Sequence, residues 1–227
     1  TVVAWAHPTL GMGDACAPSR AADTLLDMGF AQEMLNNGWV ITATDYAGVG
    51  TEGVGRYLVG QDEASDVAYS VAMAHEFPGA QTNKTWAVYG HSQGGHSALW
   101  TGELGNQILP EFSLVGTVAV APAAELVPLI AQQWNQPAQW SIGPDFIVGW
   151  KDKYPTLPLE GILTEQGSAN YEALSQDCIV EAALEGHTRA AFGQSLFTGN
   201  PLDNPEWLKT AEAQTPPPMR KEMPTFI

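Results

Sequence analysis

One serine of this sequence stands in a setting where a serine hydroxyl can act as a nucleophile. Ser92 follows the short apolar run 84–89, which favours a buried strand, and precedes residues 96–100, which favour a helix. Gly90 and Gly94 lie two residues to either side of it. A serine on a sharp strand-to-helix turn is strained, and side chains at these two positions would collide. The spacing therefore predicts a nucleophile elbow, with a glycine-rich structural turn as the alternative.

A serine nucleophile needs an imidazole base and a carboxylate that orients it, which follow the serine in the order acid, histidine. Three histidines precede the serine: His7, His75 and His91. His91 lies within the elbow, too close to Ser92 to act as its base, and His96 lies one turn into the next helix, so we expect both to pack around the elbow. His187 is the one remaining candidate. Its surroundings indicate a surface helix rather than a catalytic loop.

The composition limits the classes of partner. Aspartate and glutamate number 25 against 9 lysines and arginines, for a formal charge of −16. Such a charge repels nucleic acid and anionic membrane surfaces, and favours a neutral substrate. A hydrophobic content of 44% in 227 residues indicates one globular domain. No apolar run has the length of a membrane span, so we expect no integral membrane segment.

Buried-strand patterns alternate with helical patterns in the first half of the chain. The strands are expected at 1–6, 39–44, 84–89 and 114–121, and the helices that separate the first three at 30–37 and 61–77. In the helix 61–77, Asp62, Glu63 and Asp66 crowd the first turns, where the helix dipole favours negative charge. Such alternation predicts an α/β fold, with a mostly parallel sheet and helices on both of its faces.

Residues 123–215 break this rhythm, and we interpret them as an inserted helical cap. They contain several prolines and two helical patches, at 124–134 and 169–184. The division predicted is thus a core at 1–122, the cap, and a return to the core at 216–227, which opens one more strand. The tryptophans of the cap either line a pocket or pack its interior: Trp134, Trp140 and Trp150.

Three segments, taken in this order, resemble the secretory lipase family, α/β-hydrolases with yeast and actinobacterial members. They are 13–19, 45–51 and 90–95. The resemblance implies a secreted enzyme of lipid degradation, a lipase or esterase that cleaves carboxylic esters through an acyl-enzyme on Ser92, with a helical cap. It also implies a disulfide from the loop that holds Cys16 to the cap, which matches Cys178. No cofactor is implied, and neither a metal-ligand spacing nor a dinucleotide motif is present.

One departure from the family concerns the loop after the first strand. Family members often have glycine after the histidine here, whereas this chain has Pro8, which carries no N–H to donate. We therefore expect the oxyanion to be held by the backbone N–H of Gln93 together with that of Asp14 or Gly13. A turn-capping role for Asp14 is the alternative.

The chain looks incomplete at both ends in this interpretation. The triad acid and histidine of such a fold follow the strand that 223–227 opens, so both are expected beyond Ile227, on a C-terminal segment or a second chain. Without them Ser92 is a weak nucleophile, and we expect these residues alone to be nearly inactive. The alternatives left open are an acyltransferase or peptidase on the same machinery, and a hydrolase-like binding protein or subunit.

Overall fold

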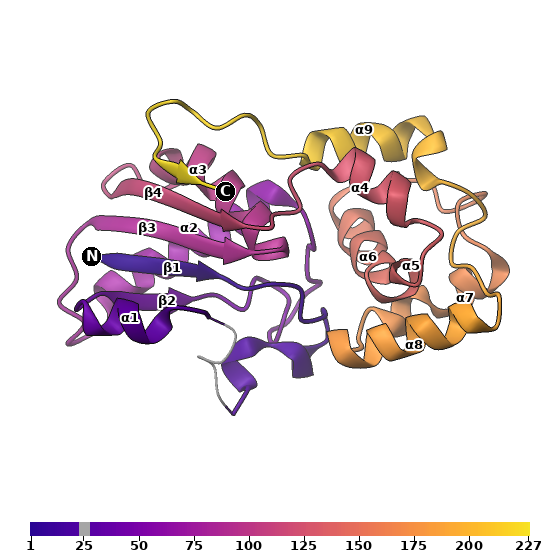
Figure 1. Ribbon diagram of the computed structural model, residues 1–227, viewed down its shortest axis with the longest axis horizontal. Helices are drawn as coiled ribbons and strands as arrows, with labels where there is room; N and C mark the ends of the chain where they lie inside the picture. Colours follow the sequence, from indigo (N-terminus) through magenta and orange to yellow (C-terminus); the bar gives the residue numbers. More distant parts are fainter. Residues whose placement is uncertain (23–27) are drawn as a thin grey trace.

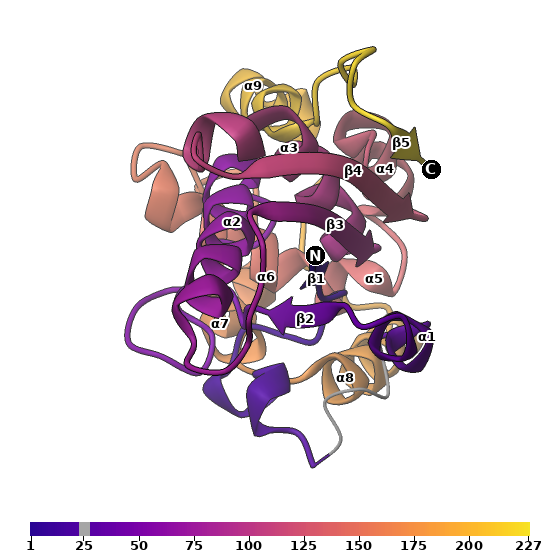
Figure 2. The same ribbon diagram turned by 90° about the vertical axis from the view of Figure 1, so that its left-hand side faces the viewer.

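The computed structural model describes residues 1–22 and 28–227, and its core is a parallel sheet. The strands are β1 (Val2–Ala6), β2 (Val40–Ala43), β3 (Thr85–His91), β4 (Ser113–Val120) and β5 (Thr225–Phe226). Their order is β2-β1-β3-β4-β5, and every neighbouring pair is parallel. Figure 2 shows this order from bottom to top. The predicted sheet is confirmed, including the strand expected near the last residues.

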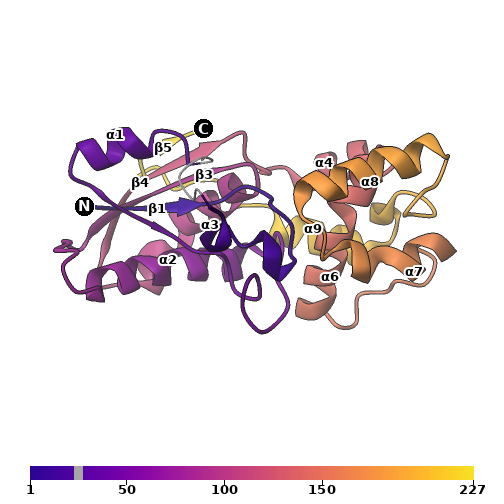
Figure 3. The ribbon, with the colours of Figure 1, turned by 90° about the horizontal axis from the view of Figure 1, so that it is seen from below.

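Helices cover both faces of the sheet, as Figure 3 shows. α1 (Ala31–Asn36) lies on one face, whereas α2 (Gly60–Glu76) and α3 (Gln93–Ile108) lie on the other. Because successive strand residues point to opposite faces, Trp5 packs with Ala31 of α1 while Ala4 and Ala6 pack with α2 and α3. The sheet is therefore buried from both sides, which explains the nearly continuous apolar runs of its strands.

Strand β2 corrects the sequence analysis, which expected 39–44 to be buried. In the described residues β2 pairs with β1 alone, and its side chains are half-buried or exposed. Trp39, just before it, is 42% exposed. The apolar β-branched pattern is the same at the edge of a sheet and at its centre, so the sequence does not distinguish the two positions.

A layer of helices lies beyond the carboxyl ends of the strands (Figure 1). It consists of α4 (Leu126–Gln133), α5 (Ala138–Ser141), α6 (Gly143–Lys153), α7 (Glu165–Leu174), α8 (Ile179–Ala191) and α9 (Pro205–Gln214). Short 3-10 helices occur at Asp14–Cys16, Pro18–Arg20 and Pro201–Asp203. None of the helices in the described part of the chain combines the length and the apolarity that crossing a membrane requires.

These helices enclose a hydrophobic cluster of their own. Trp140, Trp150 and Trp207 are completely buried in it, and the ring centroids of Trp150 and Trp207 lie 5.9 Å apart. The residues that join the cluster from the sheet side include Tyr57 and Leu58. The helical patch expected at 169–184 is two helices, α7 and α8, with the break at 175–178. The domain boundaries expected from the sequence stay a prediction.

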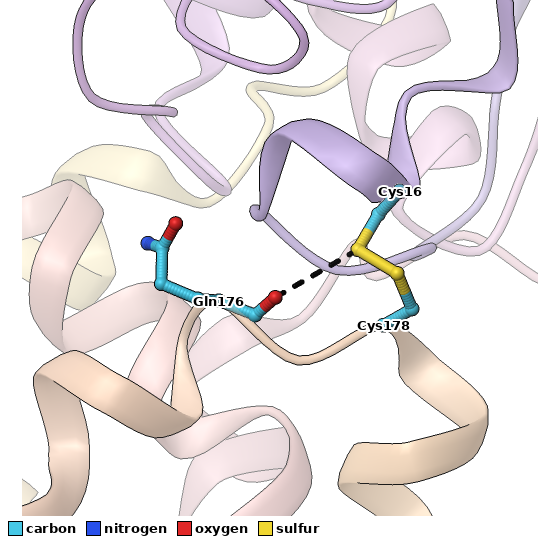
Figure 4. Close-up of a disulfide and its surroundings, with 3 residues drawn as sticks. All are labelled: Cys16, Gln176 and Cys178. Atoms are coloured by element: carbon cyan, nitrogen blue, oxygen red, sulfur yellow. Dashed lines mark hydrogen bonds between the residues drawn. A yellow bond between two sulfur atoms is a disulfide. The ribbon is translucent and has the colours of Figure 1, made fainter. Parts of the chain in front are cut away.

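A disulfide joins the loop after β1 to the start of α8, as the resemblance implied. Cys16 and Cys178 are bonded, with their Cα atoms 5.3 Å apart (Figure 4). The Sγ atom of Cys16 also lies 4.0 Å from the carbonyl oxygen of Gln176, a contact rather than a hydrogen bond because a disulfide sulfur carries no hydrogen. Glycine is required at position 13, since a Cβ there would lie 2.1 Å from the same oxygen. The N–H of Ile179 donates to the Leu10 carbonyl at 2.9 Å.

Removing this disulfide should lower the free energy of unfolding substantially. The bond joins residues 162 positions apart, and the chain-entropy estimate for a loop of this length is about 5 kcal/mol as an upper figure. We expect the Cys16→Ser, Cys178→Ser double variant to unfold at a clearly lower denaturant concentration than the parent protein. Two free thiols in the mass of the parent protein, measured without reductant, would contradict the prediction.

Candidate active site

The sheet brings the loops that carry the candidate site residues to one edge. All strands are parallel, so the segments after β1, β2, β3 and β4 leave at the same end of the sheet. The carboxyl ends of parallel strands are where α/β folds place their ligand sites. Ser92 lies between β3 and α3 at this edge, as the elbow pattern predicts.

The backbone of Ser92 is held in a conformation that a residue with a side chain rarely adopts. Its φ is 57° and its ψ is −116°. The Ser92 carbonyl accepts hydrogen bonds from the N–H groups of His96 at 3.1 Å and Ala123 at 3.2 Å, and its own N–H donates to Val120 at 3.0 Å. Three bonds to two neighbouring segments therefore maintain a strained turn, and strain of this kind is characteristic of functional sites.

The glycines of the elbow allow backbone segments to come very close. A Cβ at Gly94 would lie 1.9 Å from the carbonyl oxygen of Ala6, at the end of β1. A Cβ at Gly90 would lie 2.0 Å from the carbonyl oxygen of Gly94. The strain at Ser92 and the glycines on either side thus belong to one feature, a helix that begins directly against the end of the sheet.

Ser92 borders a cavity of about 230 Å³ between the sheet edge and the helical layer. Its wall is mainly apolar and comes from α4, α5, α6 and the residues that join them: Leu126, Leu129, Ile130, Trp134, Ala138, Ile142, Phe146 and Trp150. Thr9 and Tyr57 add hydroxyl groups on the sheet side, bonded to each other at 2.7 Å. Burial raises the pKa of Tyr57, so its hydroxyl stays protonated. The cavity is suited to an apolar chain that ends near Ser92.

The structure brings only one of the predicted oxyanion donors next to Ser92. Gln93 is the first residue of α3, so its backbone N–H has no acceptor within the helix. Asp14 is exposed, and Gly13 packs against Gln176. Neither of them lines the Ser92 cavity, whereas Thr9 of the same loop does. With Pro8 unable to donate, no local pattern distinguishes among the later residues of this loop as the second donor.

The histidines differ in their surroundings. His91 is exposed, so the expectation that it packs around the elbow is wrong: as the last residue of β3 it points away from α3. His96 is completely buried, as expected. His187 is exposed on α8, also as expected. In residues 1–22 and 28–227, no hydrogen bond joins the Ser92 hydroxyl to a histidine.

Burial lowers the pKa of His7, which is 2% exposed.

A buried polar network behind the elbow was missed by the sequence analysis. Its centre is Glu63 of α2, which is 2% exposed. One carboxylate oxygen accepts from the Gln93 amide at 2.8 Å and from the Leu58 N–H at 3.0 Å. The other oxygen lies 2.9 Å from Nδ1 of His96. Glu63 looks like Asp62 and Asp66 in the sequence, so only tertiary packing separates a buried hub from an ordinary helix-terminal charge.

A second cavity, of about 530 Å³, is lined in part by Gln93 and by several charged side chains. Its wall includes Tyr46, Glu63 and Asp66. Burial raises the pKa of Asp66 to about 6, although one of its oxygens accepts the Ala47 N–H at 2.9 Å. Within the described ranges, no group of three or more histidine, cysteine or acidic side chains is arranged to hold a metal ion.

Adding one methyl group at Gly94 should destabilise the fold. The Cβ of Gly94→Ala would lie 1.9 Å from the Ala6 carbonyl oxygen, and overpacking of this kind costs about 1–3 kcal/mol. Thermal unfolding of this variant should therefore begin at a clearly lower temperature. Gly199→Ala is the matched control, because a Cβ there meets no atom within 4 Å. Equal melting temperatures for the two variants would show that the helix start can shift freely.

The raised pKa of Asp66 makes the stability depend on pH. The ordinary pKa of an aspartate is 3.8, so between about pH 4 and pH 6 the unfolded chain has released this proton while the folded chain still keeps it. The free energy of unfolding therefore falls as the pH rises through this window. Asp66→Asn should be more resistant to urea than the parent protein above pH 6, with the difference closing towards pH 4. Asp203→Asn, at an exposed position, should show no such pH-dependent difference.

Comparisons with known proteins agree with this geometry. The family model described as secretory lipase matches residues 15–207. The rice cell wall degrading esterase LipA from Xanthomonas oryzae, in a ligand-bound form, superposes with a TM-score of 0.74 at 20% identity. The closed state of Candida antarctica lipase A gives 0.75 at 15% identity. No curated protein matches the sequence significantly.

Both matches cover nearly the whole of this chain but a smaller share of the solved protein. The match to the esterase takes in 99% of this chain and 64% of the esterase, and the match to the lipase takes in 100% of this chain and 56% of the lipase. The chain thus spans less than two thirds of either solved protein. The likeness in three dimensions shows the α/β-hydrolase fold, and with the family model matching most of its residues the chain belongs to the secretory lipase family.

Proposed function

We propose that this protein is a secreted carboxylic ester hydrolase that uses Ser92 as its nucleophile. The observation that carries the proposal is a strained serine, φ 57°, at the edge of an apolar cavity under a helical layer. The family supports an ester as substrate and secretion as the destination. The Cys16–Cys178 disulfide agrees with an oxidising, extracellular environment.

In the proposed reaction the Ser92 hydroxyl oxygen attacks the ester carbonyl carbon while the acyl chain occupies the apolar cavity. The bond to the alcohol then breaks, the alcohol leaves with a proton, and water hydrolyses the acyl-enzyme. The helical layer, 123–215, acts as the cap that keeps water away from the acyl chain. The negative charge on the carbonyl oxygen is stabilised by the Gln93 N–H and a second backbone N–H.

For the second donor we propose Thr9 in place of Asp14 or Gly13. Thr9 lines the same cavity as Ser92, and its hydroxyl is fixed by the bond to Tyr57 at 2.7 Å. This bond fixes the Thr9 side chain against Tyr57, which lines the same cavity. Asp14, in contrast, lies on the exposed side of the 3-10 helix that leads to the disulfide.

The imidazole base and its carboxylate partner are proposed to lie on a C-terminal segment or on a second chain. Two arguments support this. The fold places acid and histidine after the serine in chain order, and the candidate that follows the elbow at a distance, His187, is exposed on α8. β5 also pairs in parallel with β4, so it points towards the same edge of the sheet as the other strands.

Replacing the proposed nucleophile should remove activity without unfolding the protein. In the polypeptide that carries the acid and base, Ser92→Ala should lower the hydrolysis of a p-nitrophenyl ester by at least about a thousandfold, because no acyl-enzyme can form. It should also lose labelling by a fluorophosphonate probe. Ser70→Ala is the control, since the Ser70 hydroxyl bonds to the Val67 carbonyl of its own helix, at 2.7 Å. Retained labelling in Ser92→Ala would place the nucleophile elsewhere.

A further inference from the structure

We propose that Glu63 is a positioning residue for ester hydrolysis, which holds the Ser92–Gln93 peptide unit so that the Gln93 N–H faces the reacting carbonyl. The inference rests on the proposed function, because it concerns the oxyanion site of the same reaction. Glu63 itself does not touch the substrate cavity of Ser92. It acts through Gln93, whose side chain is 6% exposed and bonded to the Glu63 carboxylate at 2.8 Å.

The peptide unit between Ser92 and Gln93 is the part of the elbow most in need of support. Its carbonyl end is held by the N–H groups of His96 and Ala123. Its other end carries the Gln93 N–H, which has to remain free of protein acceptors if it is to bind an oxyanion. Rotation of this unit, through a change in ψ of Ser92 and φ of Gln93, would turn the N–H away. The Gln93 side-chain bond to Glu63 opposes that rotation from the free end.

The two ends are connected through His96. Its backbone N–H donates to the Ser92 carbonyl, and its ring lies 2.9 Å from the second Glu63 oxygen. Glu63, His96 and Gln93 thus close a ring of hydrogen bonds around the peptide unit. All three side chains are at most 6% exposed, so the ring is protected from competing water.

The protons in this ring can be assigned from the partners alone. Nε2 of His96 lies 2.8 Å from the Gln214 carbonyl, which can only accept, so Nε2 carries a hydrogen. One further proton lies between Nδ1 and the Glu63 oxygen. Whichever atom carries that proton, glutamate and histidine together are neutral. The Gln93 N–H therefore does not face a net negative charge that would oppose an oxyanion.

This assignment identifies an informative substitution. In Glu63→Gln the amide oxygen still accepts from Gln93 and Leu58, and the amide nitrogen donates to Nδ1 of a neutral His96. Every hydrogen bond of the ring is kept, with no change in its net charge. Glu63→Ala removes all three bonds of the carboxylate. Comparing the two variants therefore shows whether an effect on kcat comes from the hydrogen bonds of residue 63 or from the acid itself.

The experiment measures kcat and KM for a p-nitrophenyl ester in the active enzyme, with active sites counted by titration. Glu63→Ala should lower kcat about tenfold or more with KM nearly unchanged, because an oxyanion donor acts in the transition state. Glu63→Gln should retain kcat within about threefold. Val71→Ala, a buried change on the same helix, should reduce stability and leave kcat unchanged.

A double-variant cycle tests the path through Gln93. Gln93→Ala keeps the backbone N–H and removes its anchor, so it should lower kcat as much as Glu63→Ala, and the double variant should be no worse than either. Three results would each overturn the proposal. The first is a kcat of Glu63→Ala equal to that of the parent, and the second is an equal loss of kcat in Glu63→Gln and Glu63→Ala. The third is a double variant whose loss is the sum of the losses in Glu63→Ala and Gln93→Ala. If Glu63→Ala does not fold, Gln93→Ala and Glu63→Gln still decide it. A parent enzyme without Ser92-dependent turnover would instead refute the proposed function.

Discussion

The close approach of the elbow helix to the end of β1 is the constraint on which the site depends. Gly94 lies so near the Ala6 carbonyl that no side chain fits between them. Because α3 starts against the sheet, the residue before it has to turn within one position, and Ser92 takes the left-handed φ of 57°. The strain is thus a consequence of where the helix begins, and the hydrogen bonds of the Ser92 backbone offset it.

Behind the elbow, three polar side chains lie in the interior of the fold with hydrogen-bond partners. Glu63, His96 and Gln214 are nearly completely buried, yet each has partners at 2.7–3.0 Å. An unpartnered charge at this depth would cost several kcal/mol. Burying the glutamate together with the histidine avoids that cost, and it gives the interior directional bonds that apolar packing does not provide.

The sequence predicted the structure well at positions where local sterics allow few conformations or residue types. β-branched runs predicted the parallel strands, and glycines around Ser92 predicted the elbow, because sterics at those positions leave few alternatives. It was uninformative where burial depends on distant packing. Nothing local separates Glu63 from Asp62, and nothing local shows that Asp14 faces solvent while Thr9 faces the cavity. The helical layer is a further example. Its apolar pattern predicted helices, but it did not predict the break between α7 and α8 just before Cys178.

Several contacts attach the helical layer to the sheet side of the molecule, and two of them differ in kind, one at α8 and one at α9. In the first, the disulfide joins the β1 loop to the start of α8. In the second, the end of α9 is bonded through Gln214, whose carbonyl accepts from His96 and from Trp100 at 3.1 Å. The second attachment ends on the same ring of hydrogen bonds that holds Gln93. A displacement of α9 would therefore disturb the proposed oxyanion site directly, whereas a displacement of α8 is limited by a covalent bond. The position of the layer over Ser92 and the geometry of the elbow are coupled through one buried histidine.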